Sequence, residues 1–172
     1  MFRFLFYPGV IMHEFSHLIA CLLLQVKVSK LSFGLHESYV KHDTTGPIRM
    51  ALIALCPFYF GFVIGCTLFY FAKISFASQI VWFFILNYLG ICILYNSIPS
   101  AQDTKNIFNT IEDHIKKTWK KSFADKLLII FTIIILYMPI FIIAQLVTAF
   151  DKFEILRAFY VLCIFAFIYG IF

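Results

Sequence analysis

Charged residues are scarce in this 172-residue sequence. Only 13% of the residues are Asp, Glu, Lys or Arg, whereas 62% are hydrophobic. An ordinary soluble domain is about 45–50% apolar and about 25% charged. A chain this short cannot bury so much apolar surface in one water-surrounded core, so we expect lipid to solvate the excess. The composition therefore predicts an integral membrane protein.

Paired cysteines and a continuous basic face are also lacking. The five cysteines lie inside apolar segments, and none forms a CxxC pair. We therefore expect small buried hydrophobic side chains rather than disulfides or a thiolate metal site. The net charge is +5, but the basic residues lie between apolar blocks. This distribution indicates topology signals at a membrane surface and argues against a nucleic-acid partner.

Five apolar segments reach the length of about 20 residues that a helix needs to cross a bilayer. They are Phe4–Leu24, Met50–Phe71, Gln79–Ile98, Leu127–Ala149 and Phe153–Phe172. Pro8 and Gly9 either break the first segment or mark the start of its helix, and Pro139 should kink the fourth. No internal repeat or additional soluble domain is visible, so residues 1–172 are predicted to form one all-α membrane domain.

Two polar segments separate these spans. Gln25–Arg49 contains VKVSKLSFG, in which β-forming residues alternate up to Gly34, and this pattern predicts one or two short strands resembling a β-hairpin. Pro99–Lys126 carries an apolar helical face with lysines elsewhere, formed by Ile107, Ile111, Ile115 and Trp119. That face predicts an amphipathic helix lying in the plane of the membrane surface.

The two polar segments hold most of the 14 Lys and Arg residues; the opposite side would hold Arg3, Lys73, Lys152 and Arg157. Because basic loops stay in the cytoplasm, we expect both segments there and the N-terminus outside, in a bacterial-type plasma (inner) membrane. Arg3 and the LIAC tetrapeptide also resemble a lipoprotein signal. That interpretation is disfavoured because ionisable residues interrupt the apolar run such a signal requires.

Three ionisable residues of the first span form an H-E-x-x-H pattern, His13-Glu14-Phe15-Ser16-His17. Residues four apart share a helical face, so both histidines can bind one Zn²⁺ through ring nitrogens. Glu14 lies one step round the helix, where it can act as general base on a zinc-bound water. The plainer alternative is that the histidines are neutral and bond to neighbouring helices, with Glu14 protonated. Since ionisable residues in a membrane are costly and usually functional, we favour the metal site.

A second His-Glu pair, His36-Glu37, is followed by His42. Six residues separate the two histidines, which places them off a common helical face, and the segment is strand-like. We expect His36 and His42 to be solvated loop residues.

A catalytic zinc usually takes three protein ligands and a water. Asp103 is the best third candidate, because it lies just past the inner end of the third span, where Pro99 breaks the chain next to a possible water-filled cavity. However, Ser100-Ala101-Gln102-Asp103 also has the pattern of a capping box, with Ser100 as N-cap. The residues alone leave ligand and helix cap open. A weaker rival, Glu112-Asp113-His114, lies on the polar side of the amphipathic helix, where solvated charge is expected.

With these residues in view, the sequence resembles the site-2 protease family of intramembrane zinc metalloproteases. Four stretches correspond in order: HEFSH, VKVSKLSFG, TTGPIRMALIA (44–54) and NSIPSAQD (96–103). The resemblance implies that His13, His17 and Asp103 bind one zinc per chain and that Glu14 activates water. It also implies that Asn96 lies near the site and binds substrate backbone. Residues 1–103 would form the three-helix catalytic core, 104–126 a cytoplasmic amphipathic segment and 127–172 two accessory transmembrane helices.

The predicted function is a zinc metalloendopeptidase that hydrolyses peptide bonds in or near transmembrane segments of membrane proteins in the lipid bilayer. The strand-like Val26–Phe33 segment could hold the substrate extended by edge pairing. The alternative is a non-catalytic membrane scaffold that binds metal or substrate. A zinc transporter would need several polar residues along spans two to five, which offer little beyond Asn87, Asn96 and Gln145.

Overall fold

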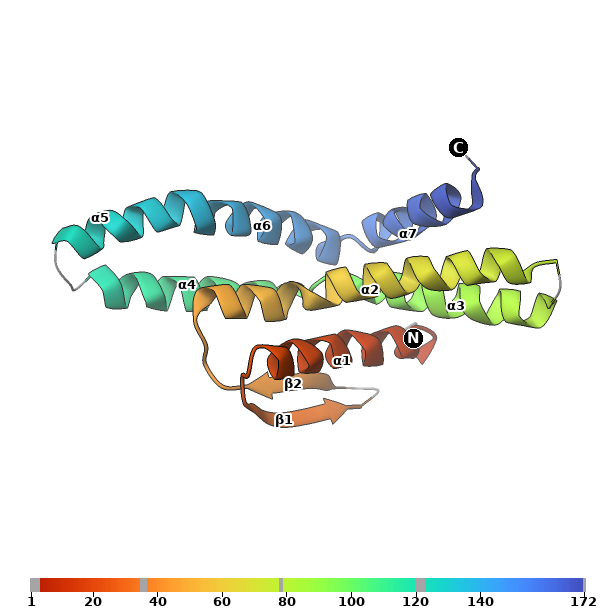
Figure 1. Cartoon of the computed structure of the whole chain (residues 1–172), viewed down its shortest axis with the longest axis horizontal. Helices are drawn as coiled ribbons and strands as arrows, with labels where there is room; N and C mark the ends of the chain where they lie inside the picture. The colour runs from red at the N-terminus through yellow and green to blue at the C-terminus, as the bar shows by residue number, and fades with distance from the viewer. Residues whose placement is uncertain (1–3, 35–36, 78, 120–122, 172) are drawn as a thin grey trace.

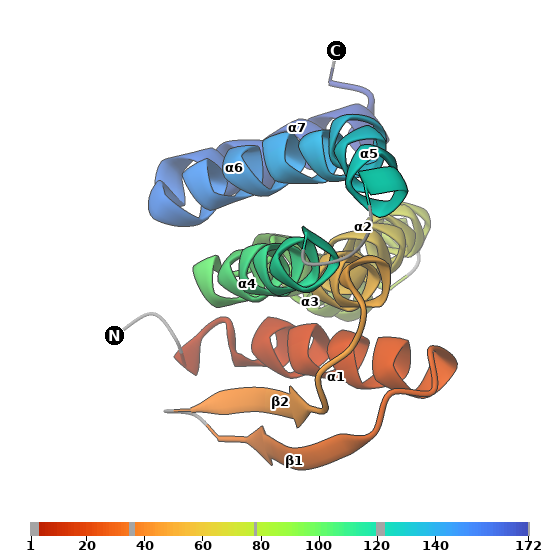
Figure 2. The ribbon, with the colours of Figure 1, turned by 90° about the vertical axis from the view of Figure 1, so that its left-hand side faces the viewer.

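The computed structural model describes residues 4–34, 37–77, 79–119 and 123–171. In chain order the elements are α1 (Tyr7–Leu23), β1 (Val28–Phe33), β2 (Ser38–His42), α2 (Pro47–Ser75), α3 (Ile80–Ser97), α4 (Ala101–Trp119), α5 (Phe123–Thr132), a π-helical turn η2 (Ile133–Tyr137), α6 (Met138–Lys152) and α7 (Glu154–Tyr169). The mainly helical fold with one short two-stranded sheet is confirmed. Three layers result: α2, α3 and α4 lie between α1 with its hairpin on one side and α5, α6 and α7 on the other (Figures 1 and 2).

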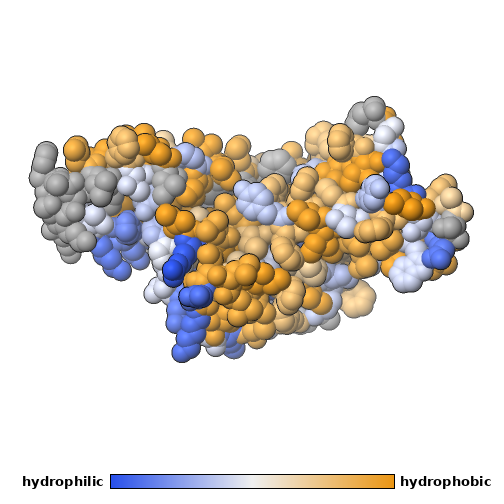
Figure 3. Space-filling model, in the orientation of Figure 1, coloured by the Kyte–Doolittle hydropathy of each residue, from blue (hydrophilic) through white to orange (hydrophobic). Residues whose placement is uncertain are grey.

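Two helical stretches of the described chain are long and apolar enough to cross a membrane, Pro47–Ser75 and Ile80–Trp119, the second comprising α3 and α4. Large apolar side chains stay exposed along these helices, among them Val63 on α2 and Phe84 on α3, each more than 60% exposed. Hydrophobic residues cover most of the face in Figure 3. The five cysteines are free thiols, buried or half-buried, as predicted.

The first helix begins at Tyr7, with Pro8 in its opening turn, where a missing N–H costs no hydrogen bond. Pro8 and Gly9 therefore mark the start of the helix and do not break the first apolar segment. Gly9 lies against α3 so closely that a Cβ atom there would be 1.9 Å from the carbonyl oxygen of Cys92. The absence of a side chain at Gly9 thus sets how near α1 approaches α3.

The predicted strands form an antiparallel hairpin in which Val28 pairs with His42 and Phe33 with Ser38. The Tyr7 hydroxyl donates a 2.6 Å hydrogen bond to the Phe33 carbonyl and ties the hairpin to the start of α1. Strand β2 lies between β1 and α1 (Figure 2). The hairpin is therefore held along the helix that carries the H-E-x-x-H residues.

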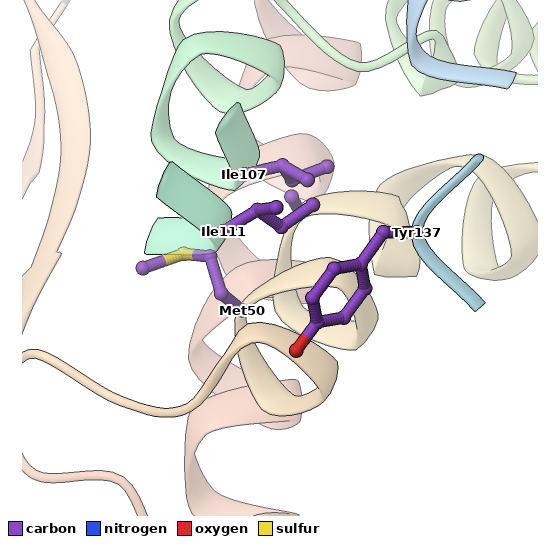
Figure 4. Close-up of a cluster of buried hydrophobic side chains, with 5 residues drawn as sticks. Met50, Ile107, Ile111 and Tyr137 are labelled. Atoms are coloured by element: carbon purple, nitrogen blue, oxygen red, sulfur yellow. The ribbon is translucent and has the colours of Figure 1, made fainter. Parts of the chain in front are cut away.

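The apolar face predicted on residues 99–126 is present on α4, but it does not lie free at a membrane surface. Ile107 is only 1% exposed, and α4 continues in the direction of α3 (Figure 1). The cluster that buries this face contains Met50, Ala54, Ile107, Ile111 and Tyr137, with Ile115 at its border (Figure 4). The prediction of an interfacial helix is wrong in this respect, because the first turns of α2 and the π-helical turn η2 cover the face. Of the four residues predicted to form this apolar face, only Trp119 is about half exposed.

The irregularity predicted at Pro139 takes the form of η2, the π-helical turn that ends two residues before it. Pro139 itself lies in the first turn of α6. A π-turn is a common way to accommodate a break in the regular hydrogen-bond ladder ahead of a proline.

Candidate metal centre

His13 and His17 project from one face of α1, and their Nε2 atoms are 3.1 Å apart. Each ring is anchored through its other nitrogen. His13 Nδ1 bonds the Asn96 carbonyl oxygen at 2.7 Å, and His17 Nδ1 bonds the Ile53 carbonyl oxygen at 2.8 Å. A carbonyl can only accept, so in both rings Nδ1 is the donor. In the neutral rings, Nε2 therefore presents a lone pair, and the two Nε2 atoms are placed where they can share one cation.

Asp103 closes the group from the first turn of α4. Its Oδ1 lies 3.3 Å from His17 Nε2 and its Oδ2 lies 3.4 Å from His13 Nε2. Ligands bonded tetrahedrally at about 2.0–2.1 Å are separated from one another by about 3.3–3.4 Å. The two Asp103 contacts are close to that spacing, but they involve different carboxylate oxygens. With one ligand atom taken from each residue, the three atoms lie within 4.8 Å of one another, so the group could hold one metal ion. Among the described residues this is the group of His, Cys, Asp and Glu side chains close enough to do so.

Of the two roles that the sequence left open for Asp103, the helix cap is present, and the position of the carboxylate beside both histidines is compatible with the ligand role. Asp103 Oδ2 accepts hydrogen bonds from the backbone N–H of Ser100 at 2.8 Å and from the Ser100 hydroxyl at 2.7 Å. In return, the backbone N–H of Asp103 lies 3.2 Å from Ser100 Oγ, which completes a capping box. A carboxylate has lone pairs for about four partners, so the cap does not consume its capacity to bind a metal.

Glu14 lies beside the three candidate ligands, on the wall of the same cavity. The cavity has a volume of about 1090 Å³, and α1, β2, the end of α3 and the start of both α4 and α7 contribute to its lining. The Glu14 carboxyl interacts with the backbone N–H of Val40, in the middle of β2. The H-E-x-x-H glutamate therefore faces an accessible space next to the histidines, as a general base must.

The resemblance placed Asn96 near the site, and the structure puts it on the cavity wall. Its backbone carbonyl anchors His13, while its side-chain Nδ2 donates to the carbonyl oxygens of Phe6, at 3.3 Å, and Cys92, at 2.9 Å. The side-chain amide thus joins the start of α1 to α3. A role of Asn96 in binding substrate stays a prediction.

His42, which was expected to be a solvated loop residue, differs from that expectation. It lies at the end of β2 rather than in a loop, and it lines the cavity, with Nδ1 bonded to the Asp43 carbonyl at 2.9 Å. His36 is outside the described residues. Glu112, Asp113 and His114 are exposed on α4, as expected, and Glu112 pairs with Lys116.

Sequence reasoning did not identify several groups at the site. The Ile53 carbonyl has no sequence signal, because every residue carries a backbone carbonyl. Strand β2 lines the cavity, whereas no residue of Val26–Phe33 is among the residues that line it. Arg157 of α7 also lines the cavity, with its guanidinium 5.6 Å from the centre of the Tyr95 ring. Basic residues are common at the ends of apolar helices, so Arg157 carries no specific site signal in the sequence.

The candidate centre thus combines two anchored histidines and one capped aspartate with an adjacent glutamate, brought together from α1 and α4. No protein-family model, curated protein or solved structure matches this chain.

Proposed function

We propose that this chain is a zinc-dependent endopeptidase of the membrane, similar in its site to the site-2 protease family. The observation that supports this most strongly is the convergence of His13, His17 and Asp103 within 4.8 Å, with Glu14 on the same cavity wall. Metal-ligating histidines typically donate their second ring nitrogen to a carbonyl or carboxylate, and both histidines do so.

The chemistry requires one contribution from the metal and the rest from the chain. A bound Zn²⁺ lowers the pKa of a water toward about 7 and polarises a carbonyl. Glu14, on the wall of the same cavity, would serve as the general base that takes up a proton and returns it to the leaving amine. The carbonyls of Asn96 and Ile53 hold the two imidazoles in the tautomer that leaves Nε2 unprotonated. The residues present therefore fit hydrolysis of a peptide bond.

The composition and the exposed apolar side chains support a site inside the bilayer. In this proposal the spans of the helical bundle insert with both basic segments in the cytoplasm and the N-terminus outside, as lysine and arginine placement favours. The substrate is then a transmembrane segment of another membrane protein. Such a helix must unwind locally before attack, because its carbonyls are tied in i to i−4 hydrogen bonds.

The hairpin offers a means of holding the unwound segment. β2 pairs with β1 along one edge, and Ser38, Tyr39, Val40 and His42 of β2 line the cavity. A peptide that lies extended in the cavity can form backbone hydrogen bonds with β2 on the side that faces away from β1. This assigns to β2 the role that the sequence suggested for Val26–Phe33.

The decisive experiment pairs metal analysis with cleavage. The full chain is purified in detergent as the parent, Glu14→Gln, His17→Ala and, as a matched control, His42→Ala, which removes an imidazole of the same cavity outside the ligand group. Zinc is measured by elemental analysis, and cleavage is measured on a fluorescence-quenched library of extended apolar peptides. We expect about one zinc per chain in the parent, Glu14→Gln and His42→Ala, with little in His17→Ala.

Cleavage should fall by several orders of magnitude in Glu14→Gln although its zinc is retained, because the general base alone is removed. Undiminished cleavage by Glu14→Gln would refute the assignment. A parent that binds zinc and cleaves no peptide, with Glu14→Gln indistinguishable from it, would favour the non-catalytic scaffold instead.

A further inference from the structure

Ser100 is the residue immediately before α4 and follows the buried Pro99. It lines the cavity that contains the candidate metal centre. Its backbone N–H and its hydroxyl both donate to the same oxygen of Asp103, Oδ2, at 2.8 and 2.7 Å. Two donors on one oxygen restrict both the position of the carboxylate and its rotation. The other oxygen, Oδ1, is the one that lies 3.3 Å from His17 Nε2.

Each of the three candidate ligands therefore has one neighbouring group that sets its orientation. The Asn96 carbonyl holds His13, the Ile53 carbonyl holds His17, and Ser100 holds Asp103. The first two anchors are backbone groups, which substitution cannot remove directly. The Ser100 hydroxyl is the anchor that a single side-chain change deletes.

We propose that Ser100 is a positioning residue of the metal centre, in addition to being the N-cap of α4. This inference rests on the proposed function. Without the hydroxyl, the carboxylate keeps one hydrogen bond to the Ser100 N–H and gains freedom to rotate away from His17. Loss of a hydrogen-bond partner of a metal ligand typically weakens metal binding by about 10–100-fold.

The start of α4 has supports that do not pass through this hydroxyl. The Thr104 N–H donates to the Ser100 carbonyl at 3.1 Å, and Thr104 Oγ1 lies 3.3 Å from the same oxygen. One turn further on, Ile107 and Ile111 pack in the cluster with Met50. We therefore expect α4 to stay folded when the hydroxyl is removed, so that the effect on metal can be measured separately.

The test compares Ser100→Thr with Ser100→Val, which have the same shape and differ only in the hydroxyl. Ser100→Ala and Ser100→Gly provide two smaller variants that lack it. Thr110→Ala is the matched control, because the Thr110 hydroxyl also lies on α4, where it donates to the Asn106 carbonyl at 2.8 Å. Zn²⁺ affinity of each full-length chain in detergent is measured by competition with a chromogenic chelator, and the visible spectrum is recorded with Co²⁺.

We expect Ser100→Val, Ser100→Ala and Ser100→Gly to bind Zn²⁺ about 10–100-fold more weakly than the parent and to show an altered Co²⁺ spectrum. Ser100→Thr should stay within a few-fold of the parent, and Thr110→Ala should be unchanged. Equal affinity in the Thr and Val variants, with a parent that does bind zinc, overturns the role of Ser100 alone. A parent that binds no zinc instead overturns the proposed function and, with it, this inference.

Discussion

Gly9 gives the most demanding test of how the site is assembled, because the expected effect of its replacement opposes simple helix propensity. In an exposed helix, Gly→Ala stabilises by roughly 0.5–1 kcal/mol. At Gly9, however, the new Cβ would lie 1.9 Å from the Cys92 carbonyl oxygen and 2.6 Å from Asn96 Nδ2. Both neighbours belong to α3, and the first is backbone, which cannot move aside as a flexible side chain would.

Relieving this clash in Gly9→Ala requires α1 and α3 to separate. An ordinary van der Waals contact begins near 3.4 Å, so the helices must move apart locally by about 1.5 Å. The 2.7 Å bond between His13 and the Asn96 carbonyl lies one turn further along α1. A shift of that size stretches this bond beyond hydrogen-bonding distance. Overpacking of this kind costs about 1–3 kcal/mol, so we expect net destabilisation together with weaker zinc binding.

Thermal unfolding in detergent, followed by circular dichroism, and zinc content measured on the same samples would check the prediction for Gly9→Ala. Gly46→Ala is the control, because a Cβ at Gly46 meets no atom within 4 Å and its backbone is extended. We expect a lower melting temperature and less zinc in Gly9→Ala, and near-parent values in Gly46→Ala. If Gly9→Ala were as stable as the parent and fully loaded with zinc, the close approach of α1 and α3 would not be what positions His13.

Two further substitutions test the packing of α4 and the double role of its aspartate. Ile107→Ala should destabilise by about 2–5 kcal/mol in thermal or denaturant unfolding, because Ile107 is 1% exposed, whereas Ile155→Ala, at a position 82% exposed, should change stability by less than about 0.5 kcal/mol. Similar small effects at both positions would contradict the burial of the α4 face. Asp103→Asn should keep the helix cap, since an amide oxygen can accept from Ser100, but should lose most zinc because the anionic ligand is gone. Melting temperature and zinc content separate the two roles, and full zinc loading in Asp103→Asn would show that the carboxylate is not a ligand.

Features that depend on neighbouring residues could be predicted from the sequence. Pro8 marks the start of α1, alternation in VKVSKLSFG predicts the strand β1, and the four-residue spacing of His13 and His17 puts both rings on one face. The capping box of Ser100 and Asp103 belongs to the same class. In each case backbone geometry over one or two turns determines the outcome, so the residues themselves carry the signal.

Contacts between distant segments were decided by the tertiary structure alone. His13 bonds the backbone carbonyl of Asn96, 83 positions away. Every residue type carries a backbone carbonyl, so the sequence does not indicate which carbonyl will orient a histidine ring. The α4 stripe of Ile107 and Ile111 has the same pattern whether lipid or α2 covers it. The sequence by itself determined which side chains can bind a metal and act as base. Only the packing of α1 against α2 and α3, with α4 packed on α2, decided that they lie together, and that Asp103 can cap α4 while it faces both histidines.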